Sequence, residues 1–294
     1  RCNAPWKRNN LPVTEHPRLG LALAPGGLTL PEGRIAVFGP RDGVSLDPLP
    51  KASVEVITTS YPDQAHYTRL GYACALEPTG RYAAAVVFLP RAKALARDRI
   101  ATARAVTAGP VIVDGQKEDG IESVLKDCRA RTEVSGPVNK AHGKLFWFDG
   151  GDLSDWTAPP AAMPDGFVTA PGIFSADGID PASALLADSL PTTLGAHVID
   201  LGAGWGYLSA RLTTHPGVTR IDLVEADHAA LAGYLSLSIP MIAWLFVSLS
   251  GAVMATLAQR VMSSYEAPVG KGAAEATSGN MALGNVSFDN TSMW

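Results

Sequence analysis

Cysteine is scarce in this sequence of 294 residues, and the three cysteines it has are scattered. Cys2, Cys74 and Cys128 are odd in number and far apart, so they fit buried or incidental thiols better than a disulfide framework or a metal site. The six histidines likewise never stand at the spacing of paired metal ligands, which argues against a zinc site. We therefore expect a metal-free protein of a reducing, cytoplasmic compartment.

A large excess of charge of either sign is also absent. The chain has 24 Lys and Arg against 28 Asp and Glu, a formal net charge of −4. An RNA partner would therefore have to meet a local basic patch, because the global charge does not attract nucleic acid. The N-terminal stretch is polar and shows no signal-peptide pattern. A hydrophobic content of 47% is compatible with packed cores, and the length suits two ordinary domains.

Residues 18–150 alternate between short apolar runs and helical segments, after an irregular lead-in over 1–17. Apolar or β-branched runs closed by Gly or Pro predict strands at 34–38, 54–59, 82–89 and 110–113, with helices at 63–76, 91–107 and 119–128. The run 82–89 is apolar almost throughout, as expected of a strand covered on both faces. The alternation predicts an α/β domain with an open, mostly parallel sheet and helices on both sides.

The turns of this first domain carry no sign of a ligand site. The turn after its first strand contains Pro40 and Arg41 where a cofactor turn would need successive glycines. The stretch 114–117 (Asp-Gly-Gln-Lys) is interpreted as a solvated turn rather than a catalytic group. Residues 151–165 predict a linker, and the aromatic run 145–148 before it needs burial. We therefore expect the two halves of the chain to pack side by side.

The stretch 197–208 (HVIDLGAGWGYL) is the most informative part of the sequence. An apolar strand leads to Asp200, glycines follow at 202, 204 and 206, and a helical run begins at once. Such glycines let the backbone turn sharply and approach a ligand closely, although any tight strand-to-helix turn favours glycine. A second apolar strand ends at Glu225, at the distance where nucleotide-binding βαβ units place an acidic residue on a ribose. Upstream, Asp180 before Pro181 fits either a helix N-cap or a part of this site.

Two stretches together resemble one enzyme family. The segment 171–180 (PGIFSADGID), followed by DLGAGWG at 200–206, is similar to the type C bacterial 16S rRNA guanine-N2 methyltransferases, which are class I S-adenosylmethionine-dependent enzymes. These enzymes carry two tandem Rossmann-like methyltransferase domains, of which only the second binds S-adenosylmethionine. Residues 61–64, 113–117 and 140–146 match that plan in the first half. The resemblance covers residues 18–230 and implies a first domain over 18–150 and a cofactor-binding domain over 166–231.

The resemblance also implies roles for individual residues. Asp200 and the glycines after it would line the methionine end of the cofactor, Glu225 would bind the ribose, and 174–180 would close over the site. The substrate would be 16S rRNA or the small ribosomal subunit. The cofactor-binding residues implied in this way are Phe174, Asp200, Gly202, Ala203, Gly204, Gly206 and Glu225.

The sequence departs from the family in its last third. The family's catalytic Asn-Pro-Pro-[Phe/Tyr] motif, which holds the guanine amine, occurs nowhere in the 294 residues. Residues 234–258 are instead apolar and uncharged, which predicts a transmembrane helix or a buried helix pair. Residues 233–294, with 237–244 and 264–271 carrying the likeness, resemble the mating-pair stabilisation proteins of F-type conjugation systems. We therefore expect a truncated methyltransferase domain followed, over 232–294, by an apolar helix and a polar tail of different origin.

Three hypotheses follow from these patterns. The chain is an rRNA methyltransferase, or an inactive remnant of one that lacks the acceptor motif. Alternatively, it is a membrane-associated component of conjugation, or a non-functional fusion of the two.

Overall fold

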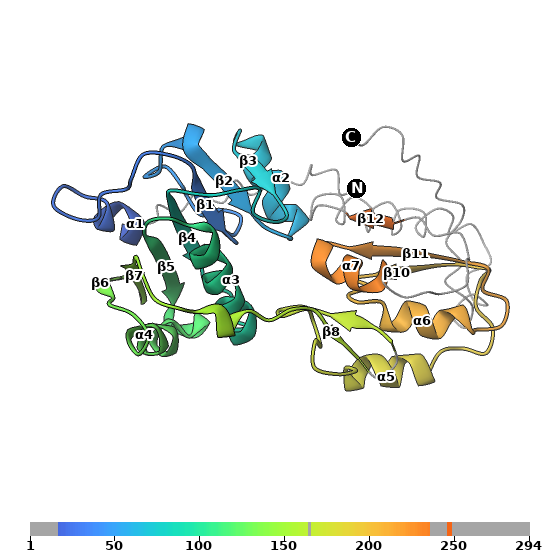
Figure 1. Cartoon of the computed structure of the whole chain (residues 1–294). Coiled ribbons are helices and arrows are strands. Elements are labelled where there is room, and N and C mark those ends of the chain that lie inside the picture. Colours follow the sequence, from blue (N-terminus) through green and yellow to red (C-terminus); the bar gives the residue numbers. More distant parts are fainter. Residues whose placement is uncertain (1–16, 164–165, 236–245, 249–294) are drawn as a thin grey trace. The chain divides into compact units, whose positions relative to one another are not determined.

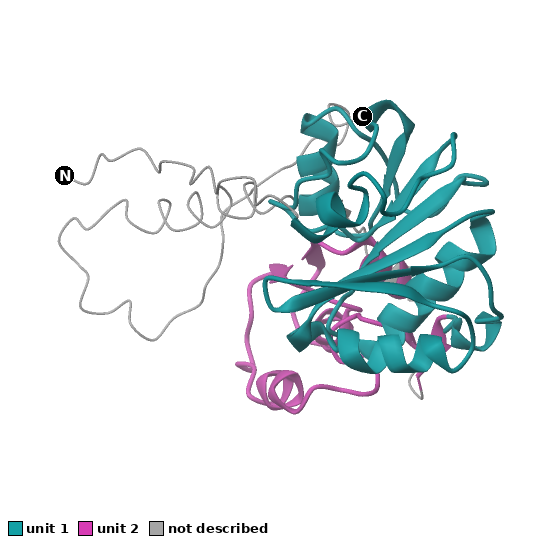
Figure 2. Ribbon diagram, turned by 90° about the vertical axis from the view of Figure 1, so that its left-hand side faces the viewer, with its two compact units in different colours: residues 1–159 teal, residues 160–294 magenta. Residues whose placement is uncertain are grey.

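A computed structural model of the chain describes residues 17–163, 166–235 and 246–248. The chain divides into two compact units, residues 1–159 and 160–294 (Figure 2). Each unit has buried apolar clusters of its own, so each is described by itself.

Unit 1 is built on a seven-stranded sheet with the strand order β3-β2-β1-β4-β5-β7-β6 (Figure 1). Strands β1 to β5 pair in parallel, while β7 runs antiparallel to both of its neighbours. The strand bounds are Ile35–Phe38 for β1, Val54–Ile57 for β2, Ala73–Ala75 for β3, Ala84–Phe88 for β4, Val111–Gln116 for β5, Ser135–Lys140 for β6 and Gly143–Phe148 for β7. The predicted α/β class with a mostly parallel sheet is confirmed for this unit.

Helices cover both faces of this sheet, as its alternating side chains require. One buried cluster joins Val87 of β4 to Ile100 of α3 and Val124 of α4, and the other joins Val86 to Leu19 of α1 and Tyr67 of α2. Every residue of β4 is buried, which explains its unbroken apolar run. The helices are α1 (Pro17–Ala22), α2 (Tyr61–Arg69), α3 (Lys93–Val106) and α4 (Ile121–Arg129), and the short 3₁₀ helices are η1 (Lys51–Ser53), η2 (Lys117–Asp119) and η3 (Ser154–Trp156).

Two predictions of local structure in unit 1 are wrong. The helix expected over 63–76 ends at Arg69, because Gly71 takes a left-handed conformation (φ +80°), and Ala73–Ala75 then forms β3. Of the solvated turn expected at 114–117, residues 114–116 are instead the end of β5, where Asp114 is only 3% exposed, and Lys117 begins η2. An Asp-Gly pair is typical of a turn, but here the carboxylate is buried against Arg18.

The aromatic run and the first part of the expected linker both belong to unit 1. Residues 145–148 lie in β7, and Phe146 and Phe148 are buried among α3 and α4 of the same unit. The expectation that their burial needs the other half of the chain is therefore wrong. Leu153 and Trp156, within the expected linker 151–165, are also buried in this core.

Unit 2 contains a parallel three-stranded sheet in the order β10-β11-β12 and a small antiparallel pair, β8 with β9. Leu212 of α6 and Val218 pack on Leu223 of β11, and Phe167, Ile173 and Trp205 form a second cluster. The elements are β8 (Ala161–Ala162), β9 (Val168–Thr169), α5 (Pro181–Asp188), β10 (His197–Leu201), α6 (Tyr207–Thr213), β11 (Arg220–Glu225), α7 (His228–Leu235) and β12 (Phe246–Ser248).

The apolar helix expected over 234–258 is not continuous. Residues 234–235 end α7, whereas Phe246–Ser248 form β12, which pairs in parallel with β11 from Leu223 to Glu225. The remaining residues of this stretch, like 1–16 and 259–294, lie outside the described part of the chain. Within that part, no helix combines the length and the apolar character needed to cross a membrane.

Candidate functional site

The glycine stretch of unit 2 forms the loop between β10 and α6. Gly202, Gly204 and Gly206 have φ values of +76°, +57° and +91°, in the left-handed region that other residues adopt only at a cost. Apart from the adjoining residues, a Cβ atom added at Gly202 or Gly204 would find no atom of the described part of the chain within 4 Å. The space beside this loop is therefore open, and its backbone is accessible to a ligand.

Backbone hydrogen bonds hold the loop against the carboxyl end of β11. The N–H groups of Gly202 and Ala203 both donate to the carbonyl of Val224, at 2.8 and 3.1 Å. The Ala203 side chain packs into the core with Leu223. Ala203, a predicted site residue, can therefore contact a ligand on the open side of the loop only through its backbone.

Glu225 lies at the end of β11 and reaches the same loop. Its Oε2 accepts a 2.7 Å hydrogen bond from the N–H of Gly204, and its Oε1 accepts bonds from the N–H groups of Ala226 and Asp227. The structure thus brings two predicted site elements together, the acidic residue and the glycine loop. A carboxylate in this position can also accept hydrogen bonds from the hydroxyls of a ligand.

Asp200 is almost fully buried behind the loop, with 8% of its surface exposed. Its Oδ2 accepts a 2.7 Å hydrogen bond from Oγ of Ser209, a buried residue of α6. Burial raises the pKa of Asp200, the hydrogen bonds of Ser209 oppose that rise, and the nearby charge of Glu225 adds to it. Asp200 therefore ties the end of β10 to α6.

Trp205 is a member of this site that sequence reasoning passed over. Its Nε1 donates to the carbonyl of Phe174 at 3.1 Å, and its ring packs edge-on against Phe167 and Tyr207. The segment 171–178 is thereby attached to the glycine loop. The side chain of Phe174 itself is 67% exposed, so this predicted site residue contacts the loop through its backbone. The sequence signal that could have pointed to Trp205 is its position between Gly204 and Gly206 in the loop.

Asp180 acts as the N-cap of α5, the first of its two proposed roles. Its carboxylate accepts bonds from the N–H and the hydroxyl of Ser183, at 2.8 and 3.0 Å. Satisfying a free N–H group at the helix start is the usual role of such a residue.

The corresponding turn of unit 1 is closed. A Cβ atom added at Gly39, after β1, would overlap the guanidinium of Arg99 from α3, so that side chain fills the space beside the turn. The space that is open beside Gly202 is therefore filled at this turn of unit 1.

Metal chemistry finds no support in the part of the chain that the structure describes. There, no group of three or more His, Cys, Asp and Glu side chains could hold a metal ion. Cys74 and Cys128 are free thiols, and burial raises the pKa of Cys128 to about 12, which keeps it protonated and unreactive.

Comparisons with known proteins converge on one class of enzyme. A family model described as "Methyltransferase small domain" matches residues 165–235. The ribosomal RNA small subunit methyltransferase C of Pseudomonas aeruginosa is 30% identical over 167 residues, which cover 52% of this chain and 50% of that protein. The protein of the same name from a Shewanella strain is 28% identical over 212 residues, covering 63% of this chain and 62% of that protein.

A solved structure is similar over more of the chain. It is a 16S rRNA N2 methyltransferase (RsmC) of T. thermophilus, in complex with AdoMet and guanosine, with a TM-score of 0.63 and 25% identity. The match covers 80% of this chain and 68% of that one. The chain spans about half the length of the Pseudomonas relative. The predicted likeness of residues 233–294 to a conjugation protein finds no support in these matches.

Proposed function

We propose that this chain binds S-adenosylmethionine at the Gly202–Gly206 loop and is an rRNA methyltransferase acting on guanine N2 of 16S rRNA. The observation that carries the proposal is the open glycine loop with the Glu225 carboxylate at its edge, 2.7 Å from the N–H of Gly204. This loop lies inside the segment that matches the methyltransferase small domain. The relative described with AdoMet supports the same cofactor.

The residues present fit this cofactor. The open sides of Gly202 and Gly204 leave room for a ligand against the backbone, and the carboxylate of Glu225 can accept hydrogen bonds from ribose hydroxyls. Asp200 places a buried carboxylate behind the loop, and a cationic ligand nearby would favour its ionised form. The bound cofactor would supply a methyl group activated on a sulfonium. The role of the chain is to orient it, because in-line transfer depends chiefly on positioning.

The acceptor is assigned by similarity. The relatives are named as small-subunit rRNA methyltransferases, and the solved one is described with guanosine. The Asn-Pro-Pro-[Phe/Tyr] tetrad of the resembled family is absent from these 294 residues. Cofactor binding and methyl transfer are therefore two halves of the proposal, and each needs its own measurement.

Titration calorimetry of the full chain with S-adenosylmethionine tests the first half. We expect saturable binding that Glu225→Ala weakens about tenfold to a hundredfold, because hydrogen bonds to a charged group contribute about 1.5–3 kcal/mol. Glu77→Gln, an exposed carboxylate of unit 1, is the matched control and should leave the affinity unchanged. Absence of binding by the unaltered chain would refute the proposal.

Methyl transfer is measured by incubating the chain with labelled cofactor and either 16S rRNA or small subunits from cells that lack the modification. N2-methylguanosine in digests of the RNA is the expected product. Cofactor binding without any labelled guanosine would reject the catalytic half and leave the binding half standing.

A further inference from the structure

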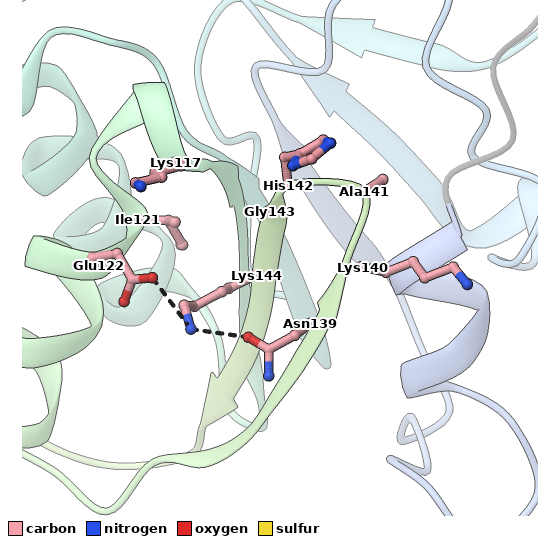
Figure 3. A pocket seen from close by; sticks show the side chains of 9 residues that line it. All are labelled: Lys117, Ile121, Glu122, Asn139, Lys140, Ala141, His142, Gly143 and Lys144. Carbon is pink, nitrogen blue, oxygen red and sulfur yellow. Dashed lines mark hydrogen bonds and ion pairs between the residues drawn. The ribbon is translucent and has the colours of Figure 1, made fainter.

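The β6–β7 hairpin of unit 1 carries a cationic surface that is separate from the glycine loop of unit 2. A cavity of about 260 Å³ lies between this hairpin and the segment from η2 to the start of α4 (Figure 3). Polar and basic side chains dominate its lining. Those used below are Lys117, Glu122, Asn139, Lys140, His142 and Lys144.

The tip of the hairpin is held in one conformation by hydrogen bonds that Arg18 and the N–H of Lys117 donate to its carbonyls. Ala141 and His142 have φ values of +48° and +55°, which non-glycine residues adopt only where the surroundings hold them. Arg18, 2% exposed, forms a bidentate pair with Asp114 at 2.6 and 2.9 Å, and its Nη1 donates to the carbonyl of Lys140 at 2.8 Å. The N–H of Lys117 donates to the carbonyl of His142 at 3.1 Å. These bonds turn the carbonyls of the tip inward and leave its side chains on the surface.

The charge of this surface is only partly neutralised. Nζ of Lys144 lies 3.2 Å from Oε1 of Glu122 and donates to Oδ1 of Asn139 at 2.9 Å. Lys117 and Lys140 are exposed, and among the described residues neither ammonium group has an ion-pair or hydrogen-bond partner. In a chain whose formal net charge is −4, this is the kind of local basic patch that an RNA partner requires.

The arrangement of the lysines suits an extended polyanion. Lys117 and Lys140 lie on opposite sides of the hairpin tip and do not converge on one point (Figure 3). A single small anion would need them to converge, whereas successive phosphates of a strand can meet them one at a time.

We propose that the β6–β7 hairpin binds the phosphate backbone of RNA, with Lys117 and Lys140 as its phosphate contacts. This inference rests on the proposed function for the identity of the polyanion. The contacts position the substrate and read no sequence, because ammonium groups meet phosphates in the same way on every sequence.

The test is binding of a fluorescent single-stranded 16S rRNA fragment to the full chain, followed by anisotropy over a series of salt concentrations. The variant Lys117→Ala/Lys140→Ala should bind more weakly, and the slope of log K against log salt should become shallower by about 0.7 for each lysine removed. Lys126→Ala, an exposed lysine of α4 outside the cavity lining, is the matched control and should keep the slope.

A second variant moves affinity in the opposite direction. Glu122→Gln removes the carboxylate that pairs with Lys144, so RNA should bind more tightly than to the unaltered chain. Structural damage would not produce that gain. Inorganic phosphate at millimolar concentration should compete only weakly, whereas complete competition would indicate a site for free phosphate.

An unchanged slope in the double variant, an equal change in Lys126→Ala, or the absence of RNA binding would each overturn the proposal. Calorimetry with S-adenosylmethionine on the same preparations separates the two inferences. Failure of the hairpin site leaves cofactor binding intact, and failure of the cofactor site leaves the salt dependence intact.

Discussion

Ser209 shows how one hydroxyl can stabilise a buried charge. It is fully buried, and its Oγ is the donor that faces the carboxylate of Asp200. A buried carboxylate without a donor is costly, since it has lost its hydration and gained nothing in return. The side chain that supports Asp200 therefore lies on the helix after the glycine loop, outside the loop itself.

We predict that Ser209→Ala lowers the free energy of unfolding of unit 2 by about 1–3 kcal/mol, the cost of leaving a buried polar group unpaired. The pKa of Asp200 should rise further, because the side-chain hydrogen bond of Ser209 that opposes its rise is lost, while the backbone hydrogen bond of residue 209 remains. Urea unfolding at neutral pH measures the effect. Thr214→Ala, which removes an exposed hydroxyl bonded only to a carbonyl, should stay within about 0.5 kcal/mol of the unaltered chain.

The pKa of the Asp127 carboxyl is shifted down, in the opposite direction from the pKa of Asp200. Its hydrogen bond from Arg97, at 2.7 Å, holds the pKa of this carboxyl below its ordinary 3.8. A lowered pKa means that the folded state favours the ionised form, so the stabilisation is present above pH 3.8 and is lost as the pH falls through the folded-state pKa.

Asp127→Asn should therefore lower stability by about 1 kcal/mol or less at pH 7, since both partners are partly exposed. The difference from the unaltered chain should shrink as the pH falls below 3.8. Thermal unfolding at several pH values checks this, with Asp149→Asn, an exposed carboxyl, as the control. A difference that grew toward acid pH would contradict the assignment.

At the scale of elements, the ends of helices and strands were predicted where one residue decides them. Asp180 with Pro181 starts α5, and glycines at 202, 204 and 206 end β10 and lead into α6. These signals are local, because a cap or a left-handed turn depends on residues a few positions apart. The strand β3 was missed because Ala73–Ala75 is short and becomes a strand only by pairing with β2.

The hairpin β6–β7 is an element whose position depends on distant residues. Arg18 of α1 lies 96 positions before Asp114 and 122 before Lys140, and it bonds to both. Breaking a buried pair on one side leaves an uncompensated charge.

Arg18→Met should therefore lower the free energy of unfolding of unit 1 by about 3–5 kcal/mol. Amide exchange over residues 135–148 should become faster. Arg18→Met/Asp114→Leu should recover part of the loss, because no buried charge is then left unpaired. Denaturant unfolding and hydrogen exchange measure both variants. An equally large loss in the double variant would show that the carbonyl contacts of Arg18 matter more than the ion pair.

At the scale of the whole molecule, two units with separate cores share one chain. As far as the described residues show, the buried clusters of residues 19–156 contain no residue of unit 2, and those of unit 2 contain none of unit 1. Units with separate cores are expected to unfold as separate cooperative blocks.

We predict two transitions in scanning calorimetry of the full chain. S-adenosylmethionine should raise the transition temperature of unit 2 alone. The added free energy of unfolding is about 2.7 kcal/mol at a hundredfold excess over its dissociation constant. In the Glu225→Ala variant, whose affinity should be tenfold to a hundredfold lower, the shift at the same concentration should fall to the equivalent of about 0.4–1.4 kcal/mol. A single transition that moves as a whole would show that the units unfold together.

The sequence by itself determined the α/β class of unit 1, most of its strands, and the glycine loop with Glu225 at the end of the next strand. Each of these depends on local periodicity or on glycine conformation, which neighbouring residues carry. Only the tertiary structure decided that Asp114 is buried, that Asp200 faces Ser209, and that Phe246–Ser248 pairs with β11. These outcomes depend on partners brought together by folding, and the free energy of burying a charge or pairing a strand edge depends on those partners.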